Sequence, residues 1–69
     1  MNLIEIGQTI RKRRKFLSIM QKDLSEITEI SLRSLIDIET GKGNPTIKQL
    51  NKIIDALGLT LKLTVEKDA

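Results

Sequence analysis

The sequence contains no cysteine and no histidine, and these two absences remove several classes of function at once. Without cysteine there is no disulfide and no thiol nucleophile, and without histidine there is no imidazole base. A zinc site would have to consist of carboxylates alone, which is rare. The chain also lacks a glycine-rich phosphate loop and a Gly-x-Ser-x-Gly motif. We therefore expect a protein that is not an enzyme and that uses no metal and no cofactor.

Long apolar runs are absent as well. No stretch approaches the ~20 apolar residues that a membrane-spanning helix needs. The first residues do not form a basic region followed by an apolar stretch, as an export signal would. We expect a cytoplasmic protein without membrane contact. Its 69 residues allow one domain, with a core small enough that oligomerisation would help to stabilise it.

Apolar residues recur at helical spacing in four segments of the chain. Asn2, Ser31 and Thr46 are good N-cap residues for the first, third and fourth of these segments, and Gly58 suits the end of the fourth. In the second segment we expect Leu24, Ile27 and Thr28 to line the inner side. The predicted helices cover residues 3–17, 21–28, 32–40 and 47–57.

Beyond Gly58 the apolar period changes from helical to alternating, which predicts a half-buried strand over residues 59–66. A lone strand is unstable, and no other segment is typical of a strand. We therefore expect this strand to pair antiparallel with the same strand of a second copy about a two-fold axis. A fifth helix or a frayed tail is the alternative. The single domain, residues 1–69, then comprises a helical core (1–58) and a dimerisation strand whose interface residues are Leu59, Leu61, Leu63 and Val65.

The segment from Gln21 to Thr40 carries the functional signal. It contains two short predicted helices joined by about three residues, the second capped by Ser31, and this pattern is typical of a helix-turn-helix. Small Ser25 would let the two helices approach closely. The amino end of the second helix would then be free to enter a DNA major groove. A basic run, residues 11–15, is either a solvated helix face or a phosphate-facing patch, in a chain of net charge +3.

Between Gly7 and Leu57 the chain resembles the phage-repressor-like helix-turn-helix proteins, the lambda repressor and Cro group that is also called the Xre family. Five pieces in this order and spacing carry the resemblance: residues 10–15 (IRKRRK), 21–27 (QKDLSEI), 30–31 (IS), 38–46 (IETGKGNPT) and 54–58 (IDALG). The resemblance implies a four-helix, all-α, repressor-like DNA-binding domain. It also implies a sequence-specific transcriptional repressor whose dimer binds a palindromic operator in double-stranded DNA.

The resemblance assigns roles to single residues. Those that would contact bases are Ser31, Leu32, Arg33, Ser34 and Ile36. Those that would contact phosphates are Gln21, Lys22, Thr40, Lys42, Asn44, Thr46 and Arg11. Arg33 is the candidate for guanine readout, and the alternative is a surface arginine paired with Asp37. Leu32 and Ile36 form an exposed apolar pair that would contact either thymine methyl groups or another protein.

Arg14 and Glu39 match a pair that many family members bury between the first and third helices, so we expect a structural ion pair. The chain also departs from the family pattern at three places, of which the exposed pair Leu32 and Ile36 is one. Met20 stands where a Thr or Ser cap is common, and Glu29 stands where the turn commonly has glycine. Because a non-glycine residue with positive φ is uncommon, the turn at Glu29 would be either strained or rearranged.

Residues 55–63 (DALGLTLKL), with a strand in place of the family's fifth helix, are similar to the HipB-type antitoxins. This resemblance implies a repressor that autoregulates its own operon and that binds a HipA-like kinase toxin. Two alternatives stay open. One is a stand-alone repressor without a toxin, and the other is a protein-interaction module that neutralises a partner without binding DNA.

Overall fold

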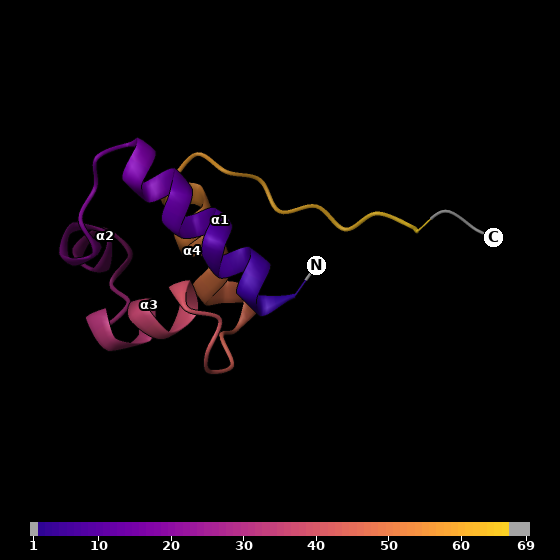
Figure 1. Cartoon of the computed structure of the whole chain (residues 1–69), viewed down its shortest axis with the longest axis horizontal. Coiled ribbons are helices and arrows are strands. Elements are labelled where there is room, and N and C mark those ends of the chain that lie inside the picture. Colours follow the sequence, from indigo (N-terminus) through magenta and orange to yellow (C-terminus); the bar gives the residue numbers. More distant parts are fainter. Residues whose placement is uncertain (1, 67–69) are drawn as a thin grey trace.

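Four α-helices form where capping residues and apolar periodicity predict them (Figure 1). The computed structural model describes residues 2–66 of the chain. Its helices are α1 (Leu3–Phe16), α2 (Gln21–Thr28), α3 (Leu32–Glu39) and α4 (Ile47–Ala56). The prediction of an all-α fold with four helices is confirmed. Each described helix is too short or too polar to cross a lipid bilayer.

Side-chain caps fix where three of the helices begin. Asn2 and Ser31 each accept the backbone N–H of the residue three positions on, at 2.9 and 3.1 Å. At the start of α4, Thr46 and Gln49 form a reciprocal capping box with two hydrogen bonds of 3.0 Å. Met20 precedes α2 without a side-chain cap. The fourth helix ends before Gly58, whose φ of +69° is the left-handed conformation predicted for this position.

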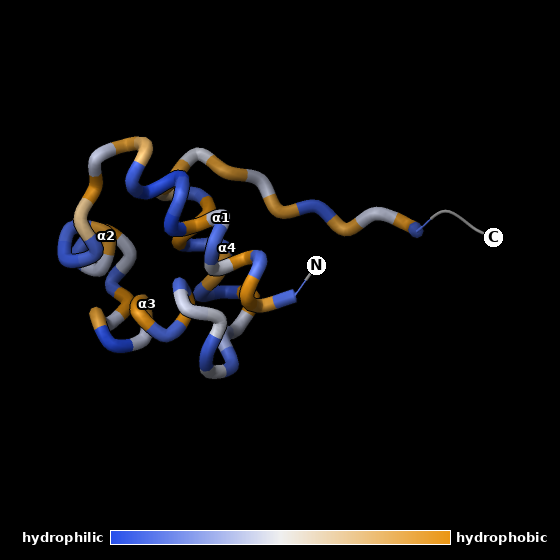
Figure 2. Tube along the Cα trace, viewed as in Figure 1, coloured by the Kyte–Doolittle hydropathy of each residue, from blue (hydrophilic) through white to orange (hydrophobic). Residues whose placement is uncertain are grey.

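The helices share one apolar core, which draws residues from all four of them and from the turn between α2 and α3. Ile6 and Ile19 pack against it from its edge. Figure 2 shows how apolar and polar residues interchange along each helix, as an inner and an outer face require. The buried members are Ile10, Leu24, Ile30, Leu35, Ile38, Leu50, Ile53, Ile54 and Leu57.

The prediction for the inner side of α2 is wrong at Ile27. Leu24 and Thr28 are buried, whereas Ile27 is 62% exposed. The half-buried Gln21 and Ser25 complete the inner face instead. Successive residues turn by about 100° around a helix, so a face centred between Leu24 and Ser25 leaves Ile27 outside. Polar side chains occupy this inner face because they bond to α3 and to the turn that follows α2.

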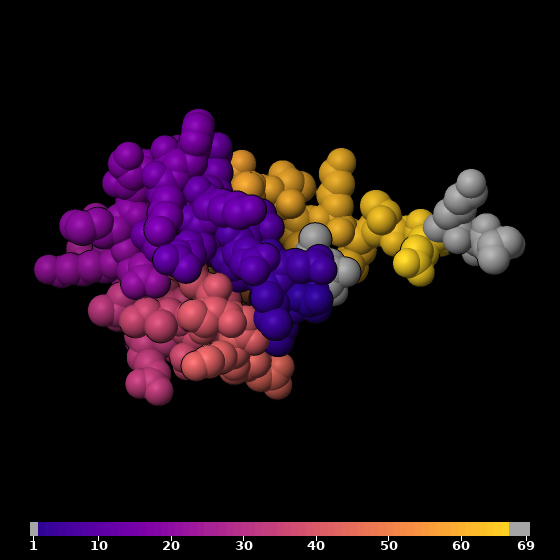
Figure 3. All heavy atoms as spheres, in the orientation of Figure 1, coloured from indigo at the N-terminus to yellow at the C-terminus, as the bar shows by residue number. Residues whose placement is uncertain are grey.

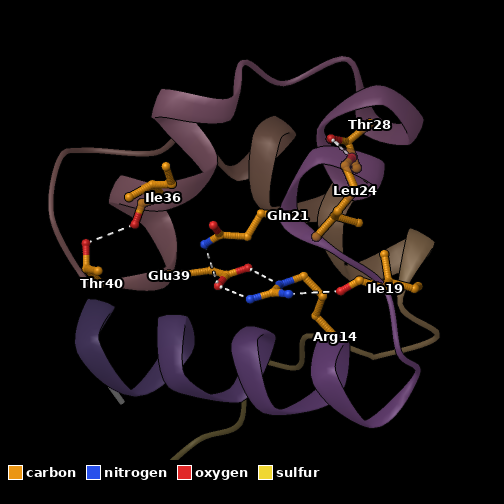
Figure 4. Close-up of polar contacts among 8 residues, drawn as sticks. All are labelled: Arg14, Ile19, Gln21, Leu24, Thr28, Ile36, Glu39 and Thr40. Atoms are coloured by element: carbon orange, nitrogen blue, oxygen red, sulfur yellow. Dashed lines mark hydrogen bonds and ion pairs between the residues drawn. The ribbon is translucent and has the colours of Figure 1, made fainter.

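Helix α1 lies directly against the carboxyl end of α3 at Gly7. A Cβ atom at Gly7 would lie 2.4 Å from the backbone oxygen of Ile38 and 2.6 Å from that of Glu39. Only glycine permits so close an approach of one backbone to another. Arg14 follows two helical turns later on the same face of α1 and also points toward α3 (Figure 4). The two residues therefore define the crossing of α1 and α3.

The segment after α4 is extended, but no strand forms within residues 2–66. Leu59 and Leu61 pack against the core, whereas Leu63 and Val65 are 99% and 93% exposed. This segment leads away from the four helices (Figures 1 and 3). The predicted strand is therefore not seen in the single chain. An extended segment becomes a strand only when its backbone pairs with another, and the described residues supply no such neighbour.

We predict that Gly7→Ala destabilises the domain by about 1–3 kcal/mol, as overpacking of a tight contact usually does. Alanine normally stabilises a helix interior by ~1 kcal/mol relative to glycine. A decrease in the free energy of unfolding on Gly7→Ala would therefore show that the close contact with α3 outweighs this helix preference. Gln8→Ala, an exposed substitution one position away, is the control. Thermal unfolding followed by circular dichroism measures both variants. A Gly7→Ala variant as stable as the parent would contradict the backbone contact.

Candidate nucleic-acid interface

Helices α2 and α3 are joined by a short turn that side-chain hydrogen bonds hold in place. Ser25 donates its hydroxyl hydrogen to the backbone oxygen of Ile30. The hydroxyl of Thr28 donates to the backbone oxygen of Leu24 at 2.7 Å and accepts the backbone N–H of Ile30 at 3.4 Å. The bonds of Ser25 and Thr28 to Ile30 hold the turn against α2. The two helices and their turn therefore have the arrangement of a helix-turn-helix.

Glu29 adopts the left-handed conformation that glycine more commonly supplies, with φ of 59° and ψ of 25°. Of the two alternatives that the sequence left open, a strained or a rearranged turn, the structure has the residue in the strained backbone region. The side chain of Glu29 is exposed. The bonds of Ser25 and Thr28 to the neighbouring Ile30 offset the cost of this conformation.

The third helix buries one side and exposes the other. Leu35, Ile38 and Glu39 are buried, which fixes the helix on the body of the domain. The residues predicted to contact bases lie around its amino end and its outer side. Of these, Ser34 is half-buried and the others are exposed: Ser31, Leu32, Arg33 and Ile36. The amino end of α3 therefore presents a surface that a partner can reach.

Arg33 extends into solvent with 87% of its side chain exposed. Its Nε atom lies 3.7 Å from Oδ2 of Asp37, one helical turn further along α3. The contact is made by Nε, and no hydrogen bond of the two terminal nitrogens occurs among the described residues. The hydroxyl of Ser31 caps α3 and donates to the hydroxyl of Ser34 at 2.9 Å. An exposed guanidinium has forked N–H donors, the arrangement with which arginine can bond to the edge of a guanine.

The loop between α3 and α4 borders the outer side of α3. Ser34 and Asp37 from α3, together with Lys42, Asn44 and Gln49, line a shallow hollow. Lys42, Asn44 and Thr46 are exposed, so a backbone phosphate can reach them. The hydroxyl of Thr40 donates to the backbone oxygen of Ile36 at 2.9 Å (Figure 4) and lies 3.1 Å from that of Asp37.

The basic run at residues 11–15 does not form one patch, because a helix turns its side chains through about 100° per residue. Arg11, Lys12 and Lys15 are exposed and, with Gln8, border a hollow on the outer side of α1. Arg13 faces α4, donating to the backbone oxygen of Leu57 at 2.9 Å. Arg14 is buried. The run thus combines a solvated basic face with two structural arginines.

Arg14 and Glu39 form a buried, two-pronged ion pair (Figure 4). The Nε and Nη2 atoms of Arg14 donate to the two carboxylate oxygens of Glu39 at 2.7 and 2.9 Å. The Nη1 atom donates to the backbone oxygen of Ile19 at 2.9 Å, in the connection from α1 to α2. Two parallel charge-assisted bonds fix orientation as well as distance. The pair therefore sets how α1, the connection and α3 lie relative to one another.

Gln21 joins this network, a contact that sequence reasoning did not find. Its Nε2 atom donates to Oε1 of Glu39 at 3.1 Å, and its side chain is half-buried at the start of α2 (Figure 4). The amide retains a second N–H and a carbonyl oxygen for other partners. The remaining predicted phosphate contacts, Lys22 and Arg11, are exposed on α2 and α1. Gln21 thus links the buried ion pair to the surface where α2 begins.

The arrangement contains no group suited to metal binding within residues 2–66, since no three carboxylates gather there. Comparison with known proteins identifies the family of the chain. The family model described as helix-turn-helix matches residues 10–63, which is more than half of the 69-residue chain. The match includes both helices of the motif, the buried ion pair and the loop before α4. No curated protein matches the chain.

We predict that Glu39→Ala lowers the free energy of unfolding by about 3–5 kcal/mol, because it leaves the charge of Arg14 buried without its partner. Glu26→Ala, which removes an exposed carboxylate from α2, is the matched control and is expected to change stability by less than about 0.5 kcal/mol. Urea unfolding followed by circular dichroism measures both. Equal stability of the two variants would mean that the ion pair does not hold the helices together.

Proposed function

The chain belongs to the Cro- and Xre-type helix-turn-helix family, whose members bind DNA and regulate transcription, and from this premise we propose that it is a homodimeric, sequence-specific repressor. One observation carries the proposal. The amino end of α3 is exposed, while Leu35, Ile38 and Glu39 fix the opposite side of the same helix on the body. A rigid helix with a free amino end is what a major groove admits.

In this proposal Ser31, Leu32, Arg33, Ser34 and Ile36 face the base edges. Arg33 donates two hydrogen bonds to a guanine, which is worth ~1–3 kcal/mol of discrimination against other bases. Leu32 and Ile36 are 43% and 37% exposed. We assign them to contacts with thymine methyl groups. The specificity for DNA sequence therefore comes from the first turns of α3. The buried residues of α3 set the angle at which the helix enters the major groove.

Phosphate contacts hold the protein in register on the duplex without reading its sequence. We assign this role to the exposed Lys22, Lys42, Asn44 and Arg11, and to the outward-facing part of Gln21. Thr40 and Thr46 contribute at the two ends of the loop before α4, where backbone N–H groups at the start of α4 also favour an anion. Neutralised phosphates release counterions, so affinity falls as salt rises.

A dimer is proposed because helix α4 is followed by an extended segment, residues 59–66, that forms no strand among the described residues. Within residues 2–66, no backbone hydrogen bond involves residues 60–66. Antiparallel pairing with a second copy through Leu59, Leu61, Leu63 and Val65 would satisfy these groups and give the molecule two-fold symmetry. Two copies of α3 would then meet half-sites of a palindrome about one helical turn apart. Occupancy of this operator blocks transcription, and no cofactor is required.

A role as the antitoxin of a HipA-like kinase is the second candidate, favoured by the extended segment that follows α4 in place of a fifth helix. We expect a kinase-like reading frame next to the gene, and a stable complex when the two proteins are produced together. A gene without such a neighbour points to a stand-alone repressor. A complex that forms while DNA binding is absent supports the third reading, a protein-interaction module.

We predict that Arg33→Ala weakens binding to the DNA upstream of the protein's own gene by about 10- to 100-fold and leaves binding to random duplex unchanged, since it removes a base contact. Lys42→Ala is the comparison. It removes a phosphate contact, so it weakens binding to both duplexes alike and lowers the salt dependence by about one unit of slope. Gel shifts at two salt concentrations measure these effects. If Arg33→Ala weakens binding to both duplexes equally, the assignment of Arg33 to base readout is wrong.

A further inference from the structure

Helix α3 carries two charged side chains whose positions oppose the dipole of the helix. Arg33 lies in the first turn, where the partial positive charge of the free N–H groups disfavours a cation. Asp37 lies in the last turn, where the free C=O groups disfavour an anion. An acid that precedes a base by four residues also stabilises a helix better than the reverse order found here. The stability of α3 therefore does not explain why these two residues occupy their positions.

The two side chains contact each other, but the rest of the domain holds them to different degrees. The Nε atom of Arg33 lies 3.7 Å from Oδ2 of Asp37, and their side chains are 87% and 37% exposed. The backbone oxygen of Asp37 accepts the N–H of Lys42 at 2.8 Å. A Cβ atom at Gly43 would lie 3.8 Å from that of Asp37. The loop before α4 therefore packs against Asp37, whereas Arg33 extends into solvent.

A carboxylate at this place is unfavourable for DNA binding in general. Asp37 lines the same hollow as Lys42 and Asn44, to which we assign phosphate contacts. Its negative charge repels the phosphates of every duplex, whatever the sequence. A group that weakens binding to all sequences can still raise specificity, because specificity is a difference between affinities. The gain must then come from an interaction that is made with the correct base pair alone.

We propose that Asp37 is a positioning residue that determines specificity by orienting Arg33 toward a guanine. This inference rests on the proposed function and adds a second residue to the readout of the same base. Asp37 holds Nε, and the planar guanidinium then offers its two terminal nitrogens to O6 and N7 of guanine. The ion pair and the base contact are thus compatible, because they use different nitrogens of Arg33.

The ion pair also restricts what else Arg33 can bind. An arginine side chain has many rotamers, and ordering them on binding costs free energy. Without its partner, Arg33 could turn to a neighbouring phosphate, a contact that carries no sequence information. At an A·T pair, adenine presents a donor where guanine presents O6, so an oriented guanidinium loses one of its two bonds. Asp37 therefore lowers the affinity for other sequences more than the affinity for the operator.

Asp37→Asn tests this proposal in the full-length protein, because it removes the charge and keeps the size of the side chain. The probes are the DNA upstream of the protein's own gene, the same duplex with single G·C pairs replaced by A·T, and a random duplex. We expect binding to the random duplex to strengthen about two- to fivefold. At the pair that Arg33 reads, we expect the preference for G·C to fall at least about fivefold. Gel shifts at one salt concentration measure both.

Three further variants separate positioning from charge and from stability. Glu26→Gln removes the same charge from an exposed site on α2 and is expected to leave the preference for G·C unchanged. Asp37→Glu keeps the charge and is expected to keep the preference within about twofold of the parent. A double variant, Arg33→Ala with Asp37→Asn, is expected to show the preference of Arg33→Ala alone, since Asp37 acts through Arg33.

Two results would overturn the positioning role. One is an Asp37→Asn variant that retains the preference of the parent. The other is a double variant that loses more preference than Arg33→Ala alone, which would mean that Asp37 contacts a base itself. A lower melting temperature together with equal weakening on all probes would make Asp37 a structural residue and would also contradict the proposal.

Failure of this inference differs from failure of the proposed function. A parent protein that binds its own upstream DNA no better than random duplex would overturn the sequence-specific repressor, and the role of Asp37 with it. A parent whose preference depends on Arg33 but not on Asp37 would overturn the role of Asp37 alone.

Discussion

The ion pair between Arg14 and Glu39 is the interaction on which the rest of the structure depends. It joins α1 to the carboxyl end of α3, and Arg14 also bonds to the connection before α2 through Ile19. Gln21 attaches the start of α2 to the same carboxylate. The angle of α3, and hence the direction of its exposed amino end, is thus fixed from its buried carboxyl end.

Burying an ion pair between helices costs free energy, because both charges lose their hydration. The hydrogen bonds of the pair offset much of this free-energy cost. Glu39 accepts three hydrogen bonds, and no buried side-chain polar atom among the described residues lacks a partner. An apolar contact of equal volume could stabilise the domain as well, but it would not fix orientation with two directed bonds. The close contact at Gly7 complements the pair, because it keeps the two backbones near enough for the side chains to meet.

Local signals predicted the helices, and contacts between distant segments explain what the sequence could not reveal. Asn2, Ser31 and Thr46 cap the helices that they were expected to cap, because capping involves residues three positions apart. The bond from Gln21 to Glu39 depends on how two helices pack, and no sequence spacing encodes it. Pairing of residues 59–66 would need a second molecule. Family resemblance supplied the assignments at the amino end of α3, and the structure adds their exposure.

Helix α1 contributes residues to the packing against α3 and also to an apolar groove that residues 59–61 of the extended segment line as well. The stability of the domain is therefore related to its proposed dimerisation. One face of α1 carries Gly7 and Arg14 toward α3, and another carries Ile6 and Thr9 toward the apolar groove. A domain of this size buries a modest fraction of its surface, so a second copy that pairs with the extended segment would stabilise the folded state by mass action. A two-fold interface at this segment would also fix the spacing of two α3 helices. Two linked DNA-binding domains bind a correctly spaced pair of half-sites far more tightly than one domain binds a single half-site. Dimerisation would then supply stability and site selection through one contact.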